Sequence, residues 1–227
     1  MDECYIDSLE NSPIHNPMMK PKTSRISTFI LATLFAAASA SAATALFDYG
    51  ATSAQSGFTQ ISVTTGVGTS NGISISNDGD GLEFRDRTTQ MNNNGNSAHP
   101  QFNLLSDIAF ENDVTTITFT LTGLAPLAEY TVLGYAYDAD FSNDSVVNDW
   151  TTNGGTVSHG WEHEDITTAS FAMANLTADA GGVATITASQ NSGPIIIWNG
   201  FEITQIPEPS TALLGGLGLL ALLRRRR

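Results

Sequence analysis

Basic residues are nearly absent from the central part of this 227-residue chain. Between Ala43 and Gln205 there is no lysine, and Arg85 and Arg87 stand against 18 aspartates and glutamates. Proteins that bind nucleic acid neutralise phosphates with a basic footprint. This segment has none, so its composition excludes nucleic acid as a partner. Two arginines cannot pair with so many carboxylates, so the others must be solvated or bind a cation.

Cysteine is almost absent as well. Cys4 is the only one, so residues 43–205 have neither a disulfide nor thiol chemistry. A G-x-S-x-G elbow and a Gly-rich phosphate loop are also missing. These gaps argue against an enzyme. Glycoside hydrolysis needs only two carboxylates at the right separation, so a polysaccharide hydrolase stays a distant alternative.

Amphipathic helices are the third absence. No stretch keeps apolar residues at i, i+3, i+4 and i+7 for three turns. Short runs of alternating or β-branched residues recur instead, beginning near residues 58, 72, 81, 115, 129, 168, 182 and 194, with turn-forming clusters such as SNDGDG and MNNNGNS between them. We predict an all-β protein whose residues 43–205, hereafter the body, form a single antiparallel β-sandwich.

Two places narrow this expectation. Leu124, Pro126 and Tyr130 are spaced as in the tyrosine corner of fibronectin type III and other sandwich domains, where the Tyr hydroxyl bonds back to the backbone. The first and last stretches of the body, LFDYGATSAQSGFTQI and IIIWNGFEI, resemble those of malectin-like and galactose-binding-like jelly rolls. The resemblance implies a jelly-roll-like body whose two ends lie side by side, with the opposite rim left for ligand.

The residues before the body have the layout of a secretory signal peptide. MKPKTSRISTFILATLFAAASASAATA, from Met19, contains three basic residues, a short apolar stretch and an A-x-A that ends at Ala42. We expect signal peptidase to cut after Ala42. Residues 1–18 are acidic, unlike a basic n-region, so we interpret them as a leader from a mis-called start and residues 19–42 as the signal. An unusually long signal peptide is the alternative.

Residues 206–227, IPEPSTALLGGLGLLALLRRRR, have three dissimilar parts. Pro207, Glu208 and Pro209 come first, an apolar run over residues 212–223 follows, and the chain ends with Arg224, Arg225, Arg226 and Arg227. This order resembles the PEP-CTERM sorting signal of exopolysaccharide-producing Gram-negative bacteria. The resemblance implies that an exosortase, a multi-spanning membrane enzyme, cuts near Pro207 to Pro209 and passes the body to the cell surface or the matrix.

Each part of the tail has a physical role in this interpretation. The prolines keep their segment extended and out of any sheet. Residues 212–223 would form a transmembrane helix about 18 Å long, which is short for a bilayer core. The four arginines stay cytoplasmic and stop transfer. A plain membrane anchor that is never cut is the alternative.

Two loops carry oxygen ligands at the spacing that Ca²⁺ uses. Asp78 and Asp80 lie in NDGDGLE, and Asp138, Asp140 and Asp144 lie in DADFSND. A structural Ca²⁺ at one of them and simple turns at both are the two interpretations, since NDGDG also fits a hairpin turn.

His159 and His163 are four residues apart, a spacing that places two metal ligands on one face of a helix. Their flanks predict loop and strand, so we interpret this segment as a solvated polar loop. Trp150 and Trp161 flank a Gly-rich stretch and are candidates for stacking on sugar rings, with burial in the core as the alternative.

The function expected from the sequence is that of an exported, non-enzymatic protein of the cell surface or the exopolysaccharide matrix of a biofilm. Its expected partners are signal peptidase, an exosortase, the inner membrane during processing, and exopolysaccharide. A secreted carbohydrate-binding module is the alternative.

Overall fold

The structure is a computed structural model, and it describes residues 42–50, 53–62, 65–79, 82–112, 114–140, 146–207 and 224. Several predicted features lie outside the described residues: the leader and signal peptide up to residue 41, Glu208 and Pro209, the helix expected over residues 212–223, the last three arginines, Asp80 and Asp144. No helix among the described residues is long and apolar enough to cross a membrane.

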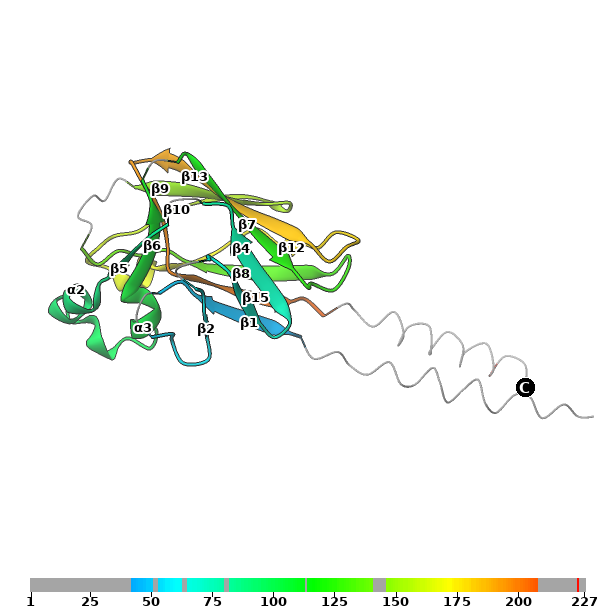
Figure 1. Cartoon of the computed structure of the whole chain (residues 1–227), viewed down its shortest axis with the longest axis horizontal. Helices are drawn as coiled ribbons and strands as arrows, with labels where there is room; N and C mark the ends of the chain where they lie inside the picture. The colour runs from blue at the N-terminus through cyan, green and yellow to red at the C-terminus, as the bar shows by residue number, and fades with distance from the viewer. Residues whose placement is uncertain are drawn as a thin grey trace, which may run out of the picture. The chain divides into compact units, whose positions relative to one another are not determined.

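The body is mostly β and contains three sheets (Figure 1). The first sheet has the order β11 (Ser170–Ala172), β8 (Glu129–Tyr135), β15 (Gly200–Gln205), β1 (Thr44–Asp48) and β2 (Thr59–Gln60), with β12 (Leu176–Thr177) also paired to β8. The second has the order β10 (Gly155–Gly160), β9 (Val147–Thr152), β13 (Ala184–Ser192), β7 (Thr116–Thr122), β4 (Ile73–Asn77) and β3 (Gly68–Ser70). The third consists of β14 (Ile196–Trp198), β6 (Asp107–Glu111) and β5 (Glu83–Asp86).

Helical segments are short. They are α2 (Thr88–Asn93), the 3₁₀ turn η1 (Asn96–Ala98), α3 (Phe102–Leu105) and the 3₁₀ turn η2 (Ile166–Thr168). Among the described strands, the pairing of β1 with β2 is parallel and the others are antiparallel. The prediction of a mostly β body built from antiparallel sheets is confirmed.

Alternation along the strands creates the core. In β7, Ile117, Phe119 and Leu121 are fully buried while the threonines between them point outward. The ring of Phe119 lies 5.0 Å from that of Phe201 in β15, so the inner faces of the two larger sheets meet in one core. Each fully buried aromatic or aliphatic side chain of this kind contributes about 1.5–3 kcal/mol through the removal of apolar surface from water.

The predicted tyrosine corner is present. Tyr130 begins the inward face of β8, is buried, and accepts a hydrogen bond of 2.8 Å at its hydroxyl from the backbone N–H of Ala125. The hydroxyl satisfies a loop amide that would otherwise lack a partner near the core. The β7–β8 loop is thereby tied to the strand that follows it.

The first and last strands of the body are neighbours, as the jelly-roll resemblance implied. Strand β1 pairs with β15 from Thr44 opposite Thr204 to Asp48 opposite Gly200. We call the side of the body where Thr44 and Thr204 lie the terminal end, and the opposite side the rim. Helices α2 and α3 lie at the rim (Figure 1).

One buried amide joins the first and third sheets at the rim. Asn199, between β14 and β15, donates its backbone N–H to Tyr135 and accepts from the N–H of Tyr49, both at 2.7 Å. Its side-chain Oδ1 accepts from the N–H of Tyr137 at 2.6 Å, and its Nδ2 donates to the carbonyl of Asp107 at 2.7 Å. Three segments far apart in the chain, at Tyr49, at Asp107 and at Tyr135 to Tyr137, are therefore positioned by a single residue.

Candidate functional site

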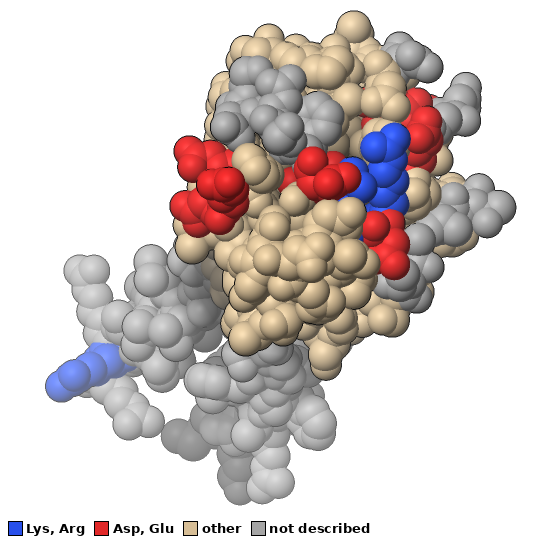
Figure 2. Space-filling model, turned by 90° about the vertical axis from the view of Figure 1, so that its left-hand side faces the viewer, with Lys and Arg blue, Asp and Glu red and all other residues tan. Residues whose placement is uncertain are grey.

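The rim carries the buried charged groups that we take as the candidate functional site. Asp48, Arg87, Asp107 and Asp138 are all nearly inaccessible to solvent there. Burying a charge is costly unless it is paired or neutralised, so each needs a physical explanation. Seen face-on, this side of the molecule shows acidic side chains on several sides of a small basic patch (Figure 2).

Arg87 is held between two aspartates. It lies directly before α2, and its Nε and Nη2 donate to the two carboxylate oxygens of Asp138 at 2.8 and 3.0 Å. Its Nη1 donates to Asp140 Oδ2 at 3.1 Å. This two-point geometry is the strong form of an Arg–carboxylate pair. It fastens α2 to the segment that follows β8.

The ion pair bears on one of the two calcium candidates. In this structure the cation that Asp138 and Asp140 bind is the guanidinium of Arg87. Asp78 is exposed, and its Oδ1 accepts a hydrogen bond of 2.7 Å from the N–H of Thr118 in the neighbouring strand β7. Across the described part of the chain, no group of three or more His, Cys, Asp or Glu side chains is placed to hold a metal ion.

Asp48 and Asp107 form a second acidic pair, and both are 1% exposed. Asp48 Oδ2 accepts a hydrogen bond of 2.6 Å from the N–H of Gln55, and its Oδ1 has no hydrogen-bond partner among the described residues. A Cβ added to Gly50 would lie 2.7 Å from Asp107 Oδ2 and 3.1 Å from Asp48 Oδ1. The two carboxylates thus converge on a space that only glycine leaves open.

Burial raises the pKa of the Asp48 carboxyl to about 7. The hydrogen bond from Gln55 opposes this rise, and the negative charge of Asp107 adds to it. A buried carboxyl without a cationic partner keeps its proton because the charged form is poorly solvated. Asp48 therefore changes its charge near neutral pH.

The tryptophans proposed to stack on sugars are inside the protein. Trp150 is fully buried and its ring lies 6.2 Å from that of Phe119, and Trp161 is 3% exposed. Neither indole has an open face for a sugar ring in this structure. The alternation of β9 explains the position of Trp150, because Asn148, Trp150 and Thr152 all point into the core.

The histidine segment also differs from the predicted polar loop. His159 belongs to β10, is buried, and stacks on Phe171 with ring centroids 4.0 Å apart. Burial lowers the pKa of its imidazole. His163 lies in the turn beyond the strand, where its carbonyl accepts a hydrogen bond of 2.6 Å from the hydroxyl of Tyr137. The two rings therefore sit on different elements.

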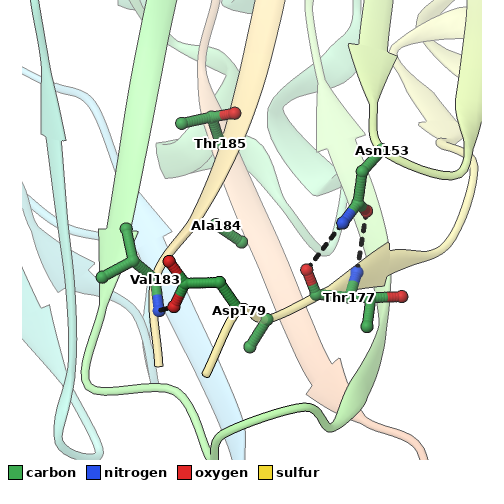
Figure 3. A pocket seen from close by; sticks show the side chains of 7 residues that line it. Asn153, Thr177, Asp179, Val183, Ala184 and Thr185 are labelled. Carbon is green, nitrogen blue, oxygen red and sulfur yellow. Dashed lines mark hydrogen bonds between the residues drawn. The ribbon is translucent and has the colours of Figure 1, made fainter. Parts of the chain in front are cut away.

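A shallow pocket of about 270 Å³ lies at the terminal end, between the β9–β10 and β12–β13 turns. The side chains of Asn153 and Asp179 in its lining are hydrogen-bonded within the protein (Figure 3). The side chain of Asn153 donates to the carbonyl of Thr177 at 2.7 Å and accepts from its N–H at 2.9 Å. Asp179 Oδ1 accepts from the N–H groups of Gly181 and Val183, each at 2.8 Å. These bonds shape the turns, so we assign the pocket a structural origin.

Sequence reasoning missed Asp48, Arg87, Asp107 and Asn199. The small number of basic residues could have pointed to Arg87. The body has only two arginines among so many acids, so an arginine there is a natural partner for a buried carboxylate. The FDYG stretch also placed an acid within two residues of a glycine. Nothing local indicated that Asp107 or Asn199 would lie against it.

Two described residues of the export and sorting segments, Ala42 and Pro207, lie where the body ends. Ala42 is partly exposed and comes two residues before β1. Ile206 donates its N–H to the carbonyl of Glu129 at 2.8 Å, and Pro207 is exposed immediately after it. Arg224 is exposed.

Comparison with known families supports the interpretation of the tail. Residues 205–227 match the PEP-CTERM protein-sorting motif. The chain therefore carries this motif at its C-terminus. The motif implies a protein that is exported, processed by an exosortase and placed at the cell surface.

Solved structures similar to this chain include malectin-like ectodomains. The ANXUR2 extracellular domain from Arabidopsis thaliana is 11% identical, with a TM-score of 0.47 over 73% of this chain and 42% of that one. FER, in complex with the plant peptide RALF23 and LLG2, is 14% identical, with a TM-score of 0.46 over 73% and 40%. Protein YxiM of Bacillus subtilis is 12% identical, with a TM-score of 0.48 over 73% and 41%. This chain spans about two-fifths of each, and likenesses at this level carry no information about ligands. No curated protein matches the sequence.

Substituting the two arginines separately tests the buried ion pair. Arg87→Ala should lower the free energy of unfolding by about 3–5 kcal/mol, because it leaves Asp138 charged and buried without its partner. Arg85→Ala should lower it by less than about 1 kcal/mol, since Arg85 is half-exposed, 3.6 Å from Glu83. Urea unfolding of the mature protein measures both. Equal losses for the two variants would contradict the assigned role of Arg87.

Asp48→Asn tests the buried carboxyl. The folded state holds a proton on Asp48 up to about pH 7, whereas the unfolded chain releases it near pH 3.8. Wild-type stability should therefore fall relative to that of Asp48→Asn as the pH rises from about 4 to 7, by roughly 4 kcal/mol in total, and then level off. Taking the difference between the two proteins cancels the other groups, such as Asp86 and Asp149, whose hydrogen bonds lower their pKa. A difference that does not change with pH would show that Asp48 is not neutral when folded.

Proposed function

We propose that this protein is an exported, non-enzymatic component of the cell surface or exopolysaccharide matrix of a biofilm-forming Gram-negative bacterium. An exosortase releases it from an inner-membrane intermediate. The observation that carries the proposal is the match to the sorting motif over residues 205–227, which begins at the last residue of β15. In this proposal the body is a jelly-roll-like domain that is exported, and the tail directs its sorting to the cell surface.

The end of β15 suits this processing. Gln205 and Ile206 still donate backbone hydrogen bonds, to Ala43 and Glu129 respectively. Pro207 cannot continue the ladder because it has no N–H, and it is exposed. Pro207, the first residue of the Pro-Glu-Pro stretch, is therefore accessible while the body remains folded.

The non-enzymatic role is supported by the state of the acidic groups at the rim. Asp48 and Asp107 are too buried to touch a substrate, and Asp138 is occupied by Arg87. General acid–base catalysis requires a group within hydrogen-bond reach of the reacting atoms. These three carboxylates support the fold instead.

A carbohydrate-binding module remains the second candidate, and one feature of the rim favours it. Asn92 and Asn93 are exposed in α2, and primary amides can donate to and accept from sugar hydroxyls. They lie on the side of the body opposite the chain ends, where the jelly-roll resemblance places the ligand. They replace Trp150 and Trp161 as the residues to test.

Processing has a direct readout in the intact mass of the protein recovered from the cell surface or the medium. The wild-type mass should lack the apolar run and the four arginines. Alanine at Pro207, Glu208 and Pro209 should leave uncut precursor in the inner membrane, because the anchor remains and the recognition segment is lost. Neutral residues in place of Arg224 to Arg227 should let some full-length protein escape uncut, since moving each arginine through hydrocarbon costs roughly 2.5 kcal/mol or more. Surface protein that still extends to Arg227 would mean that the tail is only an anchor.

The role of the body is tested by incubating the mature protein with the polysaccharide of the producing strain. We expect no increase in reducing ends, because the rim carboxylates Asp48, Asp107 and Asp138 are too buried to reach a substrate. A measurable increase would indicate the hydrolase and refute the non-enzymatic role. If the protein co-sediments with the polysaccharide, and Asn92→Ala with Asn93→Ala abolishes this while the exposed Asn175→Ala does not, the carbohydrate-binding module is the correct assignment.

A further inference from the structure

Leu127 combines two unfavourable features. It is 68% exposed, and its backbone is left-handed, with φ of 61°. A single exposed leucine is ordinary, but left-handed backbone is costly for residues other than glycine, asparagine and aspartate. Strain kept at an exposed apolar residue points to a contact made outside the folded body.

Leu127 lies at the terminal end. It belongs to the β7–β8 loop, which the tyrosine corner fixes, and its N–H donates to the carbonyl of Asp179 at 3.2 Å. Glu129, two residues later, accepts the backbone hydrogen bond of Ile206. The loop therefore stands beside the point where the chain leaves the body for the sorting segment.

The length of the sorting segment limits how far this end can stand from the membrane. Only residues 206–211 separate the end of β15 from the apolar run that begins at Ala212. Six residues span at most about 20 Å when fully extended. In the anchored precursor the terminal end is consequently kept close to the lipid surface.

Charge favours the same orientation. Glu129 and Asp179 are the described acids of the turns at the terminal end. The rim and the loops that adjoin it carry many more among the described residues: Asp78, Glu83, Asp86, Asp140, Glu162, Glu164 and Asp165. An anionic lipid surface repels the more acidic side within about a Debye length, close to 10 Å at 0.1 M salt.

We infer that in the anchored precursor the terminal end rests on the lipid surface, with Leu127 among the headgroups, and that the rim faces away from the membrane. The inference rests on the proposed function, since it needs the tail to be a membrane anchor. It adds a lipid-contact surface on the body and an orientation of the rim.

The body contains no cysteine, which makes the orientation measurable with single introduced thiols. The uncut precursor, with Pro207, Glu208 and Pro209 replaced by alanine and Cys4→Ser, is placed in phosphatidylethanolamine–phosphatidylglycerol vesicles without exosortase. One variant carries Ala180→Cys, in the exposed β12–β13 turn, and the other carries Glu164→Cys, at the rim. A 5-kDa polyethylene-glycol maleimide should react at least fivefold more slowly with residue 180 than with residue 164, and detergent should remove the difference.

Leu127→Asn separates lipid contact from folding. Asparagine tolerates the left-handed backbone better, so the variant should unfold at a higher temperature than wild type. It should also let residue 180 react faster in vesicles, because the apolar contact is gone. Val67→Asn, at the other exposed large hydrophobic residue of the described chain, should change neither the vesicle labelling nor the protection of residue 180.

The outcomes are distinguishable. Equal labelling of residues 164 and 180 in a precursor that does sediment with vesicles overturns the orientation and leaves the proposed function intact. Protection that appears only when exosortase is added assigns the surface to the enzyme and overturns the lipid contact. A precursor that does not sediment with vesicles counts against the anchor, and therefore against the proposed function itself.

Discussion

The hydrogen bonds of Asn199 are the constraint on which the rim depends. Strands β14 and β15 are separated by this residue alone, yet they belong to different sheets. A buried amide with all of these partners satisfied favours one arrangement, because leaving any of them unpaired in the core costs about 1–3 kcal/mol. The next residue narrows the choice further, since a Cβ on Gly200 would lie 2.3 Å from the carbonyl of Phe47. The WNG stretch is therefore dictated by the meeting of sheets, and Tyr49, Tyr137 and Asp107 take their positions from it.

The acidic composition then determines how the buried carboxylates are stabilised. Of the two arginines in the body, Arg85 is half-exposed and lies beside Glu83, and Arg87 pairs with the buried Asp138. Among the described residues no cation pairs with Asp48, and its pKa of about 7 means that a bound proton neutralises it over much of the acidic range. The remaining acids are mostly exposed and solvated, which keeps an exported protein soluble through mutual repulsion. At the rim, one buried carboxylate is thus neutralised by an arginine and another by a proton.

The features predicted correctly depend on residues close together in the chain, and the features missed depend on contacts between residues far apart in it. The tyrosine corner depends on Ala125 and Tyr130, five residues apart, and the sorting motif is a contiguous segment, so both could be read from the sequence. The Asp138 loop has calcium spacing, but the cation that occupies it comes from a residue 51 positions earlier. The sequence left the burial of Trp150 open. Asn148 and Thr152, on the same side of β9, are polar, so the strand lacks the apolar alternation that would identify its inward face. The pairing of Asp48 with Asp107 has no local trace, since it follows from the sheet arrangement that Asn199 secures.

The position of β15 links folding to sorting. This last strand lies between β1 and β8 and pairs with both of them. The two strands therefore cannot be joined into one sheet until residue 205 is available. The hydroxyls of Thr44 and Thr204 meet at 3.1 Å across 160 residues of chain, and contacts of that sequence separation form late because the loop must close first. During export the whole body must cross the membrane before this sheet can be completed. In the proposed function the apolar run that begins at Ala212 halts the chain when β15 has just emerged, so that the exposed Pro207 is presented for processing at the stage where the fold is completed.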